Sequence, residues 1–183
     1  MEQVGWARDL ARMLLEEQLP RRWAHTQGVA AQAERLDGVL GPDADLITAA
    51  AWLHDVGYSP ALVATGFHPL DGARYLRDVE KADKRLCQLV AHHSCAALEA
   101  DERGFGKELT AEFEPAAGEL VKALIYCDMT TDPDGRTVTF DERLQEIQSR
   151  YGPDHLVSRS MRVAAPMIRR AIAEVDLLRS RPR

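Results

Sequence analysis

The stretch from Ala49 to Pro60, AAAWLHDVGYSP, constrains this chain most strongly, because an apolar helix runs directly into a histidine and an aspartate. Residues 46–53 are apolar or small at nearly every position, which predicts a helix that is buried on all sides. His54 and Asp55 follow, and Gly57 is a plausible helix stop. A buried carboxylate is unfavourable unless it is paired or bound to a cation. Asp55 therefore needs a partner from elsewhere in the chain.

Length and composition exclude several classes of protein. A chain of 183 residues with 45% hydrophobic and 28% charged residues is typical of one compact globular domain. No apolar run approaches the ~20 residues that span a bilayer, so we expect a cytoplasmic protein without a membrane partner. The net charge of -6 argues against a nucleic-acid polymer as partner. Three cysteines without a CxxC pattern argue against disulfides and thiolate metal sites.

Hydrophobic periodicity predicts helices almost throughout and no strand, so the predicted fold class is all-α. We expect a single compact helical domain over residues 1–183, in which a core at 21–128 that carries the candidate site is flanked by a helix at 4–17 and helices at 141–179. Within the core we expect helices near 21–36, 70–77, 83–93 and 119–129. Residues 104–115 are predicted to form a loop with one helical turn. Pro166 should kink or break the last helix.

Two polar residues in predicted helices point towards the core. His25 shares a helix face with Val29, Ala33 and Leu36, and Asp128 shares one with Val121, Leu124 and Ile125. A single histidine on an apolar face is more often a satisfied core residue, and we place His155 in that class or on the surface. However, five of the six histidines lie at inward faces or helix ends, so a shared cation is the alternative. Imidazole and carboxylate ligands suit iron, manganese, zinc, nickel or cobalt better than magnesium or calcium.

The order H…HD…H…HH…D on a helical chain resembles the HD-domain metal-dependent phosphohydrolase superfamily. His25, His54, Asp55 and Asp128 match its defining ligand positions, within the motifs HTQGVA and AAAWLHDVGYSP. The motif HPLDGARYL around His68 is similar to the dinuclear branch, which includes bacterial diadenosine tetraphosphate hydrolases and cyclic-dinucleotide phosphodiesterases. The resemblance implies further ligands at His68 and at one of His92 and His93. Which of these two binds metal stays open, because they differ by about 100° around a helix.

The sequence differs from the family pattern at three places. Tyr58 stands where many members have a lysine after the HD-x-G tetrad. Ser94, Cys95 and Ala96 follow the paired histidines in place of a Gly-Tyr-Pro motif, which disfavours cyclic-di-GMP hydrolysis. Arg21 lies one turn before His25, where an acidic residue would provide for a third metal.

The implied activity is hydrolysis of a phosphate ester or anhydride in a small nucleotide-like substrate, by a water activated at one or two divalent transition-metal ions, with iron or manganese favoured. Asp55 would serve as a ligand and in catalysis. The member of the His92–His93 pair that does not bind metal would protonate the leaving group. Arg136 is the first candidate for a phosphate clamp, ahead of Arg21 and Arg85. Each of these arginines has an alternative role in surface solvation.

Other functions stay open at this stage. The substrate of the hydrolase could be something other than a nucleotide. Some proteins with the same ligand order are di-iron oxygenases. A third alternative is a non-catalytic binding protein that is stabilised by its metal. Either the first or the last helix offers a face for a homo-oligomer, and no sequence feature chooses between them.

Overall fold

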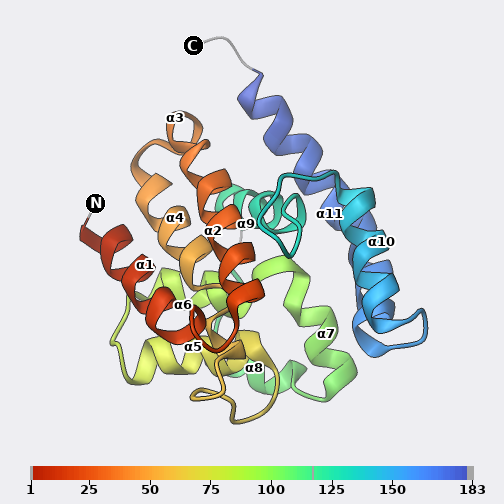
Figure 1. The fold of residues 1–183 in the computed structure, drawn as a ribbon, viewed down its shortest axis with the longest axis horizontal. Coiled ribbons are helices and arrows are strands. Elements are labelled where there is room, and N and C mark those ends of the chain that lie inside the picture. Colours follow the sequence, from red (N-terminus) through yellow and green to blue (C-terminus); the bar gives the residue numbers. More distant parts are fainter. Residues whose placement is uncertain (1, 117, 181–183) are drawn as a thin grey trace.

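The computed structural model describes residues 2–116 and 118–180, and these residues form a set of packed helices (Figure 1). The helices are α1 (Glu2–Leu15), α2 (Pro20–Glu34), α3 (Asp37–Leu40), α4 (Ala44–Leu53), α5 (His68–Asp78), α6 (Lys84–Ala91), α7 (Ala96–Arg103), α8 (Gly106–Glu112), α9 (Glu119–Met129), α10 (Phe140–Tyr151) and α11 (Leu156–Arg179). Three short 3-10 turns are η1 (Gly41–Asp43), η2 (Val56–Tyr58) and η3 (His93–Cys95). Within the described ranges there is no strand, only an isolated bridge between Thr131 and Thr137. The all-α prediction is confirmed.

Helix α4 is the buried helix that the sequence predicts. All of its residues except Asp45 are buried, and it packs against α1, α2, α6 and α9. The indole rings of Trp23 in α2 and Trp52 in α4 lie 5.5 Å apart between their centroids. The apolar and small side chains on every side of α4 explain why it can occupy the centre of the molecule.

Gly57 does not end this helix as expected. Helix α4 ends at Leu53, and Gly57 lies in η2 without a positive φ. A Cβ at Gly57 would lie 2.0 Å from the carbonyl oxygen of His68 and 2.7 Å from the amide nitrogen of Gly72. The glycine is therefore required for the close approach of η2 to the start of α5.

Helix α9 separates two hydrophobic clusters. Leu124 and Cys127 face the larger cluster, which is built with α1, α2 and α4 to α8. Ile125 and Met129 face a smaller cluster that α10 and α11 contribute from the other side. In Figure 1, α10 and α11 accordingly form the right-hand side of the molecule, away from α1 and α4. Asp128 on α9 lies between these two groups of helices.

The boundaries of several elements differ from expectation. Residues 104–115, predicted as a loop, contain helix α8, and the helix α11 continues through Pro166 without a break. The helix that was expected to open at Asp83 does so, because the Asp83 side chain accepts hydrogen bonds from the amides of Arg85 and Leu86. In the described part of the chain no helix is long and apolar enough to cross a membrane.

Candidate metal centre

Two groups of three buried or partly buried ligands lie side by side at the junction of the two hydrophobic clusters. The first group is His25, His54 and Asp128, and the second is Asp55, His68 and His93. In each group the candidate ligand atoms lie within 4.8 Å of one another. These residues come from helices α2 and α9, from the ends of α4 and α6 and from the start of α5. Only the folded chain therefore brings them together.

Three of the histidines are oriented by a backbone carbonyl. The Nδ1–H groups donate to Asp132 O from His25 (3.0 Å), to Ala51 O from His54 (2.8 Å) and to Val90 O from His93 (2.7 Å). Each ring therefore presents the Nε2 atom to the interior of the site. Metal-binding histidines are commonly held this way, because the bond fixes the tautomer and the ring orientation.

The first group holds more acceptor atoms than its protons can satisfy. Burial lowers the pKa of His25, which keeps its ring neutral, so the ring has a single N–H to donate. Burial would raise the pKa of Asp128, but contact with the rings of His25 and His54 lowers it below its usual value. A neutral His25 cannot donate both to Asp132 O and to Asp128 Oδ1, which lies 3.0 Å from Nε2. A cation bound by Nε2 and Oδ1 would leave the single N–H of the ring for Asp132 O.

His54 adds a second unsatisfied atom. Its Nε2 is buried and has no hydrogen-bond partner among the residues that the structure describes, although Asp55 Oδ2 lies 3.2 Å away in a poor orientation. Burial opposes the charged form of this ring, while the carboxylates of Asp55 and Asp128 raise its pKa. A buried ring nitrogen without a partner is unusual in a folded protein and indicates a missing ligand.

Asp55 connects the two groups through its two carboxylate oxygens. Oδ2 faces His54 in the first group, whereas Oδ1 lies 3.3 Å from His68 Nε2 in the second. The guanidinium of Arg22 donates to Oδ2 at 2.6 Å. Burial would raise the pKa of Asp55, yet Arg22 and the surrounding rings keep it well below its usual value. An ionised carboxylate with one oxygen towards each group can bridge two ions.

A strained turn follows His93 in the chain. Ser94 (φ 48°) and Cys95 (φ 63°) both adopt left-handed backbone conformations that non-glycine residues rarely occupy. His93 Nε2 lies 3.1 Å from His68 Nε2, and the Ser94 hydroxyl in this turn donates to Asp128 Oδ2. Such backbone strain persists where the surrounding structure enforces it, which is frequent at functional sites.

A small pocket opens beside both groups. It has a volume of about 70 Å³, and its lining includes Asp55, His68, His93 and Asp128 together with three arginines, Arg22, Arg143 and Arg150. Tyr58 also lines it: its ring stacks on His68 (3.9 Å between centroids) and lies under the Arg22 guanidinium (4.1 Å). The pocket is large enough for a phosphoryl group and too small to enclose a whole nucleotide.

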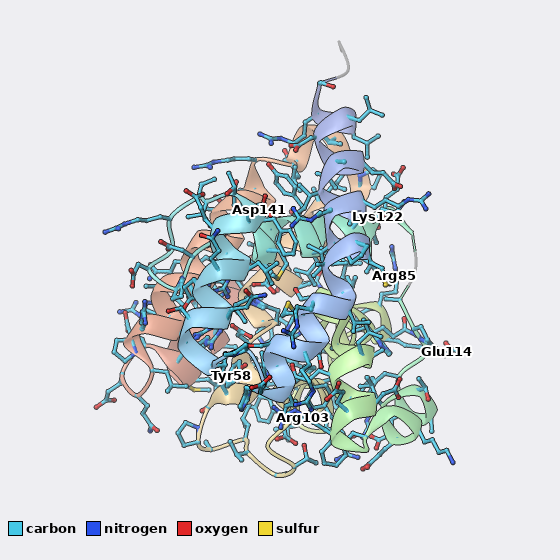
Figure 2. The ribbon with its side chains drawn as sticks, turned by 90° about the vertical axis from the view of Figure 1, so that its right-hand side faces the viewer. Tyr58, Arg85, Arg103, Glu114, Lys122 and Asp141 are labelled. Carbon is cyan, nitrogen blue, oxygen red and sulfur yellow. The ribbon has the colours of Figure 1, made fainter. Side chains whose placement is uncertain are left out.

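Some residues that the sequence singled out lie elsewhere. His92 donates from Nε2 to Phe113 O at 2.8 Å and is absent from both ligand groups. The side chain of Arg136 is exposed and does not line the pocket. Arg21 and Arg85 form exposed ion pairs with Asp134 and Asp43, and Figure 2 shows Arg85 far from Tyr58. His92, Arg85 and Arg136 do not line this pocket, whereas Arg21 lines a neighbouring cavity beside His25.

The sequence reasoning missed the arginines that do line the pocket. Arg22 precedes His25 by three residues and so shares its helix face, a signal as strong as that for Arg21, which precedes it by four. Arg143 and Arg150 carried no comparable signal. Their proximity to Asp128 depends on how α10 packs against α9, which periodicity does not reveal.

The residues present fit divalent transition-metal ions. Four Nε2 atoms and two carboxylates converge, the His54 Nε2 has no hydrogen-bond partner among the described residues, and the one N–H of a neutral His25 cannot serve both of its neighbouring acceptors. Mixed nitrogen and oxygen ligands of this kind are preferred by iron, manganese and zinc. The site is therefore suited to metal binding, and the identity of the ion is left to experiment.

The comparisons with known proteins agree with this geometry. A family model described as the HD domain matches residues 22–129, which include all six candidate ligands and exclude α10 and α11. No curated protein and no solved structure matched the chain. Since the family match covers more than half of the 183 residues, the chain belongs to the HD domain family.

Proposed function

We propose that the protein is a metal-dependent phosphohydrolase that cleaves a phosphate ester or anhydride in a small nucleotide-like substrate. The observation that carries this proposal is the pair of ligand groups joined by Asp55, placed beside an arginine-lined pocket of phosphoryl size. Bound divalent ions supply an activated water and neutralise charge on the phosphoryl oxygens. His25, His54 and Asp128 would hold one ion, and Asp55, His68 and His93 would hold the other.

The remaining site residues bind and orient the substrate in this proposal. Arg22 lines the pocket while donating to Asp55, so it can exchange that carboxylate for a phosphoryl oxygen. Its planar donor group suits two oxygens at once. Ser94 fixes the second oxygen of Asp128 and thereby keeps Oδ1 directed at His25.

A neighbouring cavity supports the proposal that the substrate carries an organic leaving group. It has a volume of about 340 Å³ and shares Arg22, Tyr58 and Arg150 with the phosphoryl pocket. Leu19, Pro20 and Pro133 give it a mainly apolar wall. A phosphate in the small pocket could therefore extend an apolar or planar group, such as a nucleoside, into this second space.

The first test is the metal content of the purified protein, followed by a panel of nucleotides and dinucleoside polyphosphates with iron or manganese. We expect about two ions per chain in the wild type and about one in His68→Ala, with hydrolysis reduced about 100-fold or more in the variant. Arg136→Gln, an exposed substitution, is the control and should hydrolyse normally. Full activity in Asp55→Ala, or wild-type protein that binds metal without turning over any phosphate compound, would contradict the proposal.

A further inference from the structure

Helix α10 carries a positive face that the ligand groups do not explain. Arg143, Glu146 and Arg150 are spaced three and four residues apart, so they share one side of the helix. Glu146 Oε2 accepts from Arg143 Nη1 at 2.5 Å, and Glu146 Oε1 lies 3.4 Å from Arg150 Nε. One carboxylate thus serves two guanidinium groups, which leaves an excess positive charge at the pocket wall.

Arg143 is also incompletely satisfied. Its side chain is only 5% exposed, and within residues 2–116 and 118–180 its buried Nε finds no hydrogen-bond partner. A buried guanidinium normally uses its donors fully, because an unmade bond to a charged group is costly. Arg143 lies in the part of the pocket wall that α10 provides, so an oxygen of an anionic group bound beside the phosphoryl group would supply the missing acceptor.

The acidic residues nearby do not cancel this charge. Glu99 lines the same pocket but is engaged by Arg103 Nε at 2.7 Å, and Asp55 and Asp128 belong to the ligand groups. Figure 2 shows Tyr58 near the end of α10 that is opposite Asp141, and Arg150 lines the pocket together with Tyr58. The positive face is therefore directed at whatever the pocket binds.

From these contacts we infer that Arg143 and Arg150 form an anion subsite that holds a second anionic group of the substrate, beyond the phosphoryl group at the ligand groups. This inference rests on the proposed function and narrows its substrate class. The protein selects compounds with two neighbouring anionic groups, such as phosphoanhydrides, over simple monoesters. The selecting residues lie outside the stretch that matches the HD domain model.

The test compares binding of inorganic pyrophosphate and orthophosphate to manganese-loaded protein by calorimetry, at matched free manganese and ionic strength. Metal content is measured after each titration to exclude chelation. We expect wild-type protein to bind pyrophosphate about 10-fold or more tightly than orthophosphate, each 10-fold corresponding to about 1.4 kcal/mol. Arg143→Gln and Arg150→Gln should each remove most of that preference while changing the orthophosphate Kd about 2-fold or less. Arg143→Lys should retain part of it.

Arg170→Gln is the matched control, since Arg170 pairs with Glu174 on the exposed side of α11 and does not line the pocket. If Arg143→Gln does not fold, Arg150→Gln carries the test, because its side chain is 31% exposed. The inference would be overturned if the variants lost affinity for pyrophosphate and orthophosphate equally, or if both variants kept the wild-type preference for pyrophosphate. Hydrolysis of phosphate compounds with no preference for pyrophosphate would refute the subsite and leave the proposed function standing. A preference for pyrophosphate without hydrolysis of any phosphate compound would support the subsite and contradict the proposed function.

Discussion

His92 and His93 are adjacent in sequence and have opposite surroundings. His93 turns Nε2 towards His68 because Val90 O holds the other ring nitrogen, while His92 turns its Nε2 to Phe113 O. Burial lowers the pKa of both rings, so both are neutral near pH 7. The two residues thus place a candidate ligand and a structural residue side by side within a single dipeptide.

Substituting each of them by glutamine tests this separation. His93→Gln should lose one of the two bound ions and nearly all hydrolysis, because no nearby side chain replaces its Nε2. His92→Gln should keep both ions, and its free energy of unfolding should fall by about 1–2 kcal/mol from the altered bond to Phe113. Elemental analysis and chemical denaturation measure these effects. Loss of metal from the His92 variant and not from the His93 variant would reverse the assignment.

At the scale of elements, the contact between η2 and α5 sets the distance between Asp55 and His68. Gly57 and Gly72 allow the two backbones to touch, and His68 begins α5 at this contact. The turn η2 follows Asp55 directly, so any separation of η2 from α5 moves Asp55 away from His68. The second ligand group therefore depends on this glycine contact more than the first group does.

Gly57→Ala should show that dependence. The added Cβ meets backbone atoms, which must shift, so we expect a loss of about 1–3 kcal/mol in stability and the selective loss of one ion. Gly5→Ala is the matched control, because a Cβ at Gly5 in α1 has no atom within 4 Å and alanine favours a helix interior. Differential scanning fluorimetry and metal analysis report both quantities. An unchanged metal content in a destabilised Gly57→Ala protein would show that the contact does not position the ligands.

At the scale of the whole molecule, the site joins the two hydrophobic clusters. Its ligands come from helices of the larger cluster and from α9, which also packs against the smaller one. The ligands lie close together only in the folded chain, so an ion that binds here should stabilise the folded state relative to the unfolded state by mass action. Charge repulsion among the ligands should weaken the metal-free form.

Metal removal should therefore lower the Tm. At a free metal concentration 100-fold above Kd, binding adds about 2.7 kcal/mol for one site, which corresponds to roughly 5–11 °C for a chain of this size. The shift should be reversed by adding manganese and should shrink in His54→Ala. Thermal unfolding with and without a chelator measures it. An identical Tm in both conditions would mean that the residues do not bind an ion in the folded state.

The sequence predicted much of this arrangement and failed where tertiary packing decides. Periodicity identified α4 as buried, and the inward faces of His25 and Asp128 could be read from helical spacing alone. Helix α8 was missed because seven residues with one buried apolar side chain, Leu109, give too short a pattern. The choice between His92 and His93 depends on which backbone carbonyl each ring meets, Phe113 O or Val90 O, and the positions of Arg143 and Arg150 depend on the docking of α10. Neither arrangement can be recognised from the local sequence.

His25 and Asp128 meet in the first ligand group although 103 residues separate them along the chain. During translation at ~5–20 residues per second, His25 would precede Asp128 by roughly 5–20 s. A nascent chain that ends before α9 lacks Asp128, so its first ligand group is incomplete, whereas all three residues of the second group are already present. The ion of the first group should thus enter after α9 has left the ribosome. Incorporation of two ions into ribosome-bound chains truncated before Asp128 would contradict this order of events.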